Sequence, residues 1–246
     1  MKPHRTELTG RPPKRLLWVG NSYFYYNNSI HHHVAEMARA QDPSTEHQGV
    51  SVTISGSGLD WHDIESYFRR DAIGRYAFTS DNDIIFTPQG NGFDAVIMMD
   101  SSQGPIHPRL QSSFHGAAKQ QSRLVREKGA SPVFFMSWAY RNKPEMTARL
   151  AHEYTKAGNC NDALVIPAGL AFSRAMAEEP ELELYQPDQS HPSLIGTYLA
   201  ACTAHCTLFR NGWRTNSYVA ALPMTVALKL QSVAASTVET YFDRGP

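Results

Sequence analysis

Short apolar runs alternate with longer stretches of helical spacing along most of the chain. Stretches with apolar residues at every third or fourth position predict helices at about residues 27–39, 60–70, 112–128, 145–157 and 171–178. Between them lie runs with the length and apolar content of strands, at residues 15–20, 50–54, 95–99, 132–137 and 163–166. Strands that alternate with helices are typical of an α/β domain with a parallel sheet.

The last third of the chain contains two further helical patterns. After Leu194 the apolar residues recur at 4-3-4-3 spacing, which indicates a core helix; they are Ile195, Leu199, Cys202, Cys206 and Phe209. Residues 219–241 predict a final helix. Residues 71–92 form a polar, glycine-containing insert with an edge strand expected at 84–86, and such inserts often shape a pocket.

The length and the N-terminal segment bear on domain organisation. Residues 1–14 are polar and contain proline, which predicts a loose lead-in. The chain of 246 residues is long enough for one large domain or two small ones, and it contains no internal repeat. Because strands alternate with helices across the whole chain, we expect a single domain over residues 1–246.

Candidate chemistry begins where the first predicted strand ends. Leu16 to Val19 form an apolar run that stops at Gly20-Asn21-Ser22. Ligands of open α/β sheets bind at the carboxyl ends of the strands, so the hydroxyl of Ser22 is a candidate nucleophile. On this segment alone, Asn21 and Ser22 are more often explained by a turn or a helix cap.

A carboxylate and an imidazole near the other end of the chain favour the interpretation of Ser22 as a nucleophile. Asp188 and His191 are three positions apart, and Pro192-Ser193 then open a helical segment. A serine nucleophile needs a base to take its proton, and the base needs a group that fixes its tautomer. Asp188 and His191 have the residue types for these two roles.

These two segments resemble the first and last blocks of the SGNH (GDSL-like) hydrolase superfamily. The resemblance spans about residues 15–211, and it is closest to the branch that opens with Gly-Asn-Ser-Tyr instead of Gly-Asp-Ser. It implies a flavodoxin-like three-layer α/β/α sandwich with a five-stranded parallel sheet of order 2-1-3-4-5. It also implies that Ser22 attacks an ester carbonyl and that His191 and Asp188 complete a catalytic triad.

The resemblance further implies an oxyanion hole. The backbone amides of Ser22 and Gly56 match two of the family's donors, with Gly58 as the reserve for Gly56. The family's third block carries an asparagine in a Gly-x-Asn-Asp pattern, and Gln103 falls on that position here. Glutamine has the same amide on one more methylene, so Gln103 can serve only if its backbone lies farther back.

Four more residues near predicted strand ends are candidate substrate contacts. We expect His62 at the rim of the pocket. Asp100 would repel an oxyanion, so it should face elsewhere or bind a substrate hydroxyl. Trp138 and Tyr140 follow the fourth strand, where they can either wall the pocket or pack in the core.

Composition excludes several classes of protein. The net charge of +0 and the pI of about 7.2 indicate no basic surface for nucleic acid. No apolar segment is long enough for a membrane span, which needs roughly 18 residues, and no signal-peptide pattern opens the chain. From these patterns we expect a soluble, cytoplasmic protein.

Metal and cofactor chemistry is not predicted. His31-His32-His33 lie in a helical pattern, where consecutive side chains point in different directions and chelate poorly. Cys202, His205 and Cys206 share a helical stripe without a local fourth ligand. Three cysteines in all also make no disulfide framework.

The sequence therefore predicts a serine hydrolase that cleaves a small-molecule acyl ester through an acyl-enzyme and needs no cofactor. Its polar, aromatic loops favour a short acyl group on a polar carrier such as a sugar. One alternative is a non-catalytic carbohydrate- or ester-binding protein on the same scaffold, which Gln103 and Asp100 motivate. Another is a flavodoxin-like nucleotide binder, although no Gly-rich phosphate loop follows the first strand. The oligomeric state stays open.

Overall fold

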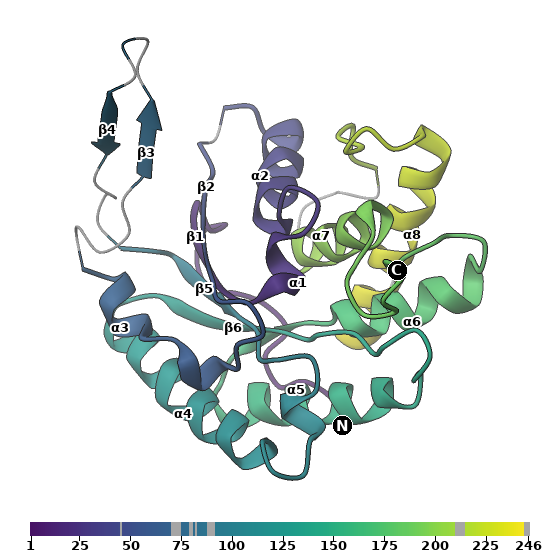
Figure 1. Cartoon of the computed structure of the whole chain (residues 1–246), viewed down its shortest axis with the longest axis horizontal. Helices are drawn as coiled ribbons and strands as arrows, with labels where there is room; N and C mark the ends of the chain where they lie inside the picture. The colour runs from purple at the N-terminus through teal and green to yellow at the C-terminus, as the bar shows by residue number, and fades with distance from the viewer. Residues whose placement is uncertain are drawn as a thin grey trace.

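The computed structural model describes residues 1–44, 46–69, 75–78, 81, 83–87, 92–209 and 215–243. Its main sheet has five parallel strands in the order β2-β1-β5-β6-β7 (Figure 1). They are β1 (Arg15–Gly20), β2 (Gln48–Thr53), β5 (Ala95–Met98), β6 (Ser131–Phe135) and β7 (Leu164–Ile166). Counted within this sheet, the order is the predicted 2-1-3-4-5.

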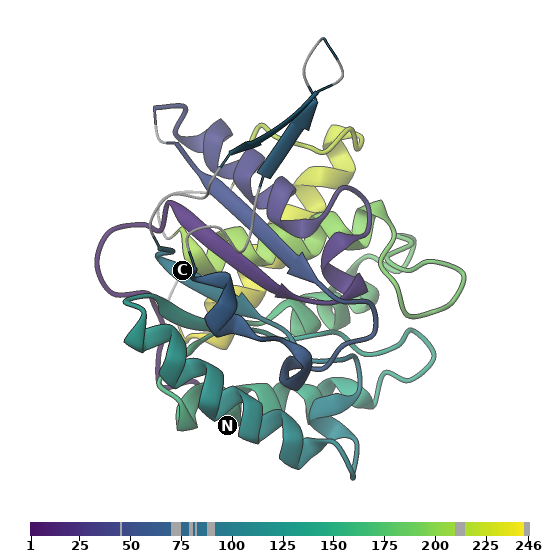
Figure 2. The same ribbon diagram turned by 60° about the vertical axis from the view of Figure 1, so that its left-hand side comes forward.

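Helices cover both faces of the sheet, as Figure 2 shows. One apolar layer joins the sheet to η1 (Leu59–Trp61), α3 (Ile64–Tyr67), η2 (Gly104–Ile106), α4 (Gln111–Glu127) and α5 (Met146–Cys160). The other joins it to α1 (Ser22–Tyr25), α2 (Ile30–Gln41), α6 (Ala168–Glu178), α7 (Leu194–Leu208) and α8 (Met224–Tyr241). Alternate residues of each central strand enter opposite layers because strand side chains alternate in direction. The predicted three-layer α/β/α sandwich is confirmed.

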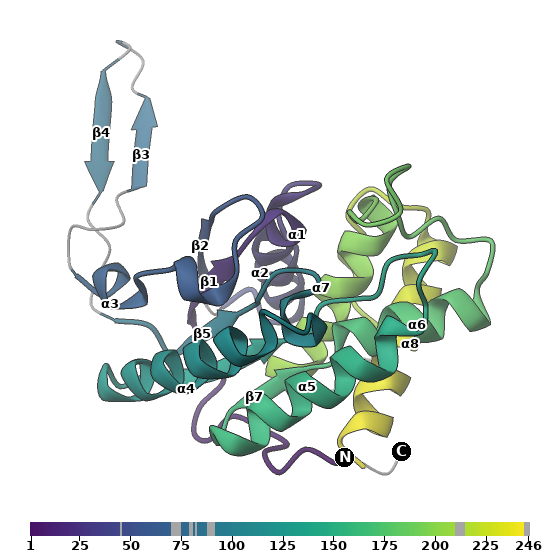
Figure 3. The same cartoon turned by 60° about the horizontal axis from the view of Figure 1, so that its bottom comes forward.

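The insert before β5 differs from the prediction. The strand expected at 84–86 is β4 (Ile84–Thr87), and it pairs antiparallel with β3 (Arg75–Phe78) in a separate two-stranded sheet. The hairpin projects from the body of the molecule (Figure 3), so β4 is not an edge strand of the main sheet. We expected residues 71–92 to shape the pocket, but part of this segment lies outside the residues that the structure describes.

Several helix boundaries also differ, for local reasons. The helix expected from residue 27 or 28 begins at Ile30, because Asn27, Asn28 and Ser29 all have positive φ (51°, 68° and 68°) and form a tight left-handed turn. The helix expected over 60–70 is divided into η1 and α3. Among the described residues, no helix combines the length and the hydropathy required to cross a membrane.

The N-terminal lead-in is held against the body at the edge opposite the site. The Arg5 guanidinium donates to both carboxylate oxygens of Asp162 at 3.1 and 2.8 Å. The Asn159 side chain accepts from the His4 amide at 2.7 Å. A cavity of about 630 Å³ lies between residues 8–14 of this segment, the end of α2 and Phe209, away from Ser22.

Candidate active site

Ser22, His191 and Asp188 meet at the carboxyl edge of the sheet. Ser22 is the first residue of α1, directly after β1, whereas Asp188 and His191 lie in the turn between α6 and α7. Ser22 Oγ is 2.8 Å from His191 Nε2, and His191 Nδ1 is 2.6 Å from Asp188 Oδ2. This geometry allows the imidazole to donate from Nδ1 to Asp188 while Nε2 accepts the serine proton.

Asp188 is tied to its own turn as well as to the imidazole. Its Oδ1 accepts from the backbone amides of Ser190 and His191, each at 2.9 Å. Partial burial acts to raise the pKa of Asp188, but the hydrogen bonds from the His191 ring and from the two amides outweigh it and lower the pKa below its usual value. Asp188 is therefore ionised at neutral pH.

The turn that carries His191 is fixed from both sides. The Arg141 amide donates to the Gln189 carbonyl at 2.9 Å, and the Trp138 indole donates to the Ser190 carbonyl at 3.0 Å. The Gln186 amide donates to the His191 carbonyl at 2.8 Å. These bonds hold the imidazole in register with Ser22 without help from a substrate.

Two tyrosines pack against the His191 ring. Tyr26 stacks on it with ring centroids 4.5 Å apart and an interplanar angle of 18°. Tyr23 meets it edge-on at 5.5 Å and 80°. Because both tyrosines follow Ser22 closely in the sequence, the segment that presents Ser22 also restricts the rotation of the His191 ring.

The amides expected to form the oxyanion hole lack acceptors. Within the part of the chain that the structure describes, the backbone N–H groups of Ser22, Gly56 and Gly58 make no hydrogen bond to the protein. Gly56 has φ +72° at an exposed turn after β2, a conformation that favours glycine. Free amides at adjacent strand ends are the donors that an oxyanion requires.

Gln103 lies next to this edge, after β5. Its Nε2 donates to the Tyr140 hydroxyl at 2.9 Å, and Ser102 Oγ is 2.8 Å from the same hydroxyl. Tyr140 is half-buried, so Gln103, Ser102 and Tyr140 form one polar cluster at the strand ends.

Asp100 points into the protein rather than toward solvent. It is 4% exposed, and its Oδ2 accepts from the Leu59 amide at 2.8 Å while Oδ1 accepts from Ser101 Oγ at 3.2 Å. Burial raises the pKa of Asp100 to about 6, against the lowering effect of these hydrogen bonds. A Cβ on Gly104 would lie 1.8 Å from Asp100 Oδ1, so the carboxyl needs a glycine there. In this position Asp100 supports the loop after β2.

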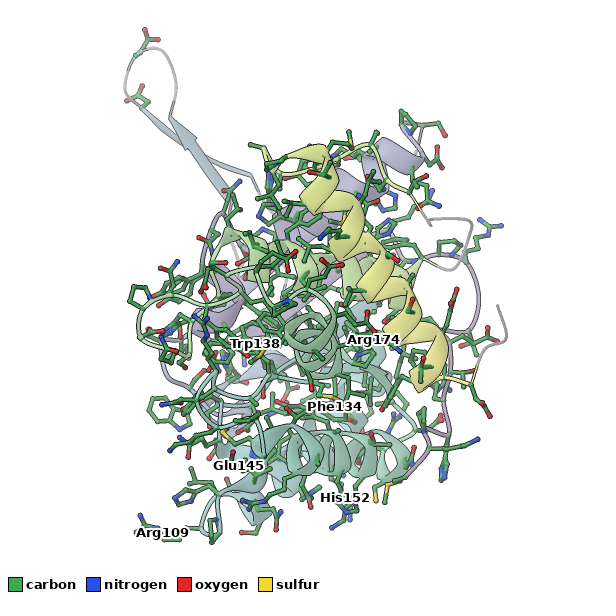
Figure 4. The ribbon with its side chains drawn as sticks, turned by 90° about the vertical axis from the view of Figure 1, so that its right-hand side faces the viewer. Arg109, Phe134, Trp138, Glu145, His152 and Arg174 are labelled. Atoms are coloured by element: carbon green, nitrogen blue, oxygen red, sulfur yellow. The ribbon has the colours of Figure 1, made fainter. Side chains whose placement is uncertain are left out.

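His62 and Trp138 are likewise interior. His62 is 3% exposed, and its Nε2 lies 3.0 Å from both the Gly20 carbonyl and Ser57 Oγ. Burial lowers the pKa of His62, so its ring is neutral. Trp138 is fully buried and stacks between Tyr23 at 4.6 Å and Phe172 at 4.2 Å; Figure 4 shows it among the helices. The role we propose for His62 is to fix the end of β1 before Ser22, and for Trp138 to fix the turn that carries His191.

Asn21 has a structural role that sequence reasoning did not assign. Its Nδ2 donates to the carbonyls of Ser57 at 3.0 Å and Asp100 at 3.1 Å, and its Oδ1 accepts from the Tyr23 amide at 3.2 Å. It is thus the N-cap of α1 and a bridge between three segments. The place of Asn21 between Gly20 and Ser22 is a sequence signal for a helix cap, but it does not indicate a bridge between strands.

No metal centre is assembled near these groups. Over residues 1–44, 46–69, 75–78, 81, 83–87, 92–209 and 215–243, no group of three or more His, Cys, Asp or Glu side chains could hold a metal ion. His33 instead lies 2.8 Å from both the Tyr218 hydroxyl and the Asn27 carbonyl.

Solved structures share this architecture. A DUF4886 family protein from Bacteroides uniformis aligns with TM-score 0.63 at 17% identity, over 94% of this chain and 95% of that one. A protein from Slackia heliotrinireducens described as a candidate SGNH hydrolase aligns with TM-score 0.57 at 21% identity, over 78% and 97%. A variant of an acetyl-xylooligosaccharide esterase from Geobacillus aligns with TM-score 0.55 at 13% identity, over 81% and 95%.

No family model and no curated protein matches the chain in sequence comparisons. The structural similarity nevertheless identifies the fold, because it covers most of each chain and includes a structure described as a candidate SGNH hydrolase. The chain has the fold of the SGNH hydrolase superfamily. The resemblance that the sequence predicts is confirmed at this level.

Proposed function

We propose that the protein is a serine hydrolase that cleaves acyl esters. The observation that carries this proposal is the hydrogen-bonded series from Ser22 Oγ through His191 to Asp188, with contacts of 2.8 and 2.6 Å. A serine hydroxyl becomes an effective nucleophile only when a positioned base removes its proton as it attacks. Esterases among the structures with the same fold add support.

In the first half of the reaction, Ser22 Oγ forms a bond to the ester carbonyl carbon while its proton passes to His191 Nε2. The carbonyl electron pair moves onto oxygen, where the Ser22 and Gly56 amides and the Gln103 side chain can donate to it. The oxyanion then returns this pair, the bond to the alcohol oxygen breaks, and His191 gives its proton to the departing alcohol.

In the second half, water attacks the acyl-enzyme by the same route. His191 takes a proton from the water, the new tetrahedral oxyanion collapses, and Ser22 leaves with the proton from Nε2. Asp188 stays ionised throughout and stabilises the imidazolium at each stage. The products are a carboxylic acid and the alcohol.

For the substrate we propose a short acyl group on a polar carrier such as a sugar. The rings of Tyr25 and Tyr26 stack at 5.6 Å and continue outward from His191, and Tyr25 is 41% exposed. An exposed aromatic face with hydroxyl groups suits the apolar face of a sugar ring. Some structures with this fold are named as acetylxylan esterases, which agrees with such a carrier.

The test is hydrolysis of p-nitrophenyl acetate combined with labelling by a fluorophosphonate. We expect turnover and modification of one serine, located by peptide mapping at Ser22. Ser22→Ala should abolish both, whereas Ser112→Ala, an exposed serine of α4, should retain both. A folded wild-type protein without turnover or Ser22 labelling would instead support the binding-protein alternative. Acetylated sugars and esters of rising chain length would then define the substrate.

A further inference from the structure

Gln103, Tyr140 and Ser102 form a hydrogen-bonded group where two strands of the sheet end. Gln103 Nε2 is 2.9 Å from the Tyr140 hydroxyl, which is 2.8 Å from Ser102 Oγ. We call these three side chains the Gln103 network. It joins the segment after β5 to the segment after β6.

The amide at one end sets the direction of the bonds. A side-chain N–H can only donate, so the Tyr140 oxygen accepts from Gln103 and its single proton is available for Ser102. The Ser102 oxygen, 2.8 Å away, is placed to accept that proton. Gln103 and Ser102 together therefore fix the Tyr140 hydroxyl.

The network also leaves one amide hydrogen of Gln103 available. Within the described residues, Tyr140 is the acceptor that Gln103 Nε2 meets, and the nitrogen carries a second hydrogen. Because an amide group is planar, the bond to Tyr140 fixes the direction of that second hydrogen. Gln103 follows β5, which pairs with β1, and β1 ends next to Ser22.

We propose that Tyr140 is a positioning residue whose hydroxyl, fixed by Ser102, aims the Gln103 amide at the oxyanion that forms during attack by Ser22. This inference rests on the hydrolase function proposed above. It explains how glutamine can stand where the related pattern has asparagine. The longer side chain has one more rotatable bond, and the hydrogen bond to Tyr140 restrains it.

The first test is Tyr140→Phe, which removes only the hydroxyl. We expect kcat for p-nitrophenyl acetate to fall about tenfold with KM changed less than about twofold, because an oxyanion donor acts mainly in the transition state. The matched control is Tyr241→Phe, which loses a phenol bonded to Thr155 Oγ1 at 2.8 Å, far from the site. It should retain wild-type kcat. A rise in KM with unchanged kcat in Tyr140→Phe would make Tyr140 a substrate contact and overturn the proposal.

The second test is a double-mutant cycle with Gln103→Ala. Removing the donor should lower kcat by about 100-fold. If Tyr140 acts through Gln103, Tyr140→Phe should then cost less than about twofold in the Gln103→Ala background, since coupled residues are not additive. Additive losses would mean that Tyr140 acts by another route and would overturn the inference while the hydrolase function stands. A wild-type enzyme without Ser22-dependent turnover would overturn the proposed function and this inference with it.

Discussion

The side-chain amide of Asn21 donates to the carbonyl oxygen of Asp100 across 3.1 Å, and so ties the end of β1 to the end of β5. The same Nδ2 donates to Ser57 at 3.0 Å, so the loop after β2 is tied in as well. Ser22 follows Asn21 directly. Asn21 therefore sets the distances between Ser22 and the segments after β2 and β5, which act on one carbonyl in the proposed reaction.

Asn21→Asp should lower both stability and activity strongly, although the two side chains are nearly the same size. The substitution replaces an N–H₂ donor with a carboxylate oxygen that faces two carbonyl oxygens, so two bonds become repulsive contacts in a buried site. We expect a lower melting temperature and a loss of kcat of about tenfold or more. Asn28→Asp, at an exposed position with the same change of charge, is the control and should behave as wild type. Equal behaviour of the two variants in thermal unfolding and ester turnover would refute the bridging role.

Tyr26 should affect catalysis through its ring rather than its hydroxyl. Its stack on His191 at 4.5 Å limits the positions that the imidazole can take. Tyr26→Ala should therefore lower kcat, by about tenfold for a base that is no longer held in place. Tyr26→Phe keeps the ring and should stay within about twofold of wild type. A large loss in Tyr26→Phe, measured by steady-state kinetics, would show that the hydroxyl carries the effect.

Local signals in the sequence predict the strands and single out Ser22, Asp188 and His191, whereas the sheet order and the triad follow from the resemblance to the SGNH hydrolase superfamily. Apolar runs mark the strands, and short motifs mark their ends. The interior placement of His62 differs from the expected pocket rim, and for Asp100 and Trp138 the sequence left an interior and a pocket position open. Burial depends on which distant segments pack around a residue, so local signals do not decide it. The start of α2 was also misplaced, because asparagine favours both a helix cap and the left-handed turn that it forms here.

Gly104 is a residue whose identity depends on tertiary packing, which the sequence alone does not reveal. A Cβ at this position would lie 1.8 Å from Asp100 Oδ1 and 2.7 Å from Ser101 Oγ. Gly104→Ala should therefore displace the Asp100 carboxyl and cost about 1–3 kcal/mol of stability, as overpacked buried sites do. Gly116→Ala is the control: it meets nothing within 4 Å in the interior of α4 and should be neutral or stabilise by about 0.5–1 kcal/mol. Chemical denaturation of both variants would decide, and equal stabilities would contradict the packing argument.

The Asp100 carboxyl should make the stability of the folded protein depend on pH, and the direction of this dependence follows from its pKa. Its pKa is raised from 3.8 to about 6 in the folded protein, so between these values the folded state binds more protons than the unfolded state. The free energy of unfolding therefore gains a contribution as pH falls from about 6 toward 4, and loses it as pH rises again.

Asp100→Asn isolates this contribution from other titrating groups. Asparagine can still accept from the Leu59 amide through its carbonyl oxygen, but it has no charge to bury. Relative to wild type, the variant should gain stability as pH rises from 4 to 7, by up to about 2–3 kcal/mol, since one pKa unit corresponds to about 1.4 kcal/mol. Protonation of the buried, neutral His62 destabilises both proteins on acidification. Its effect therefore cancels in the difference between their free energies of unfolding. Urea unfolding of the two proteins at several pH values measures this difference in the free energy of unfolding. A difference that does not change with pH would show that the pKa of Asp100 is the same in the folded and unfolded states.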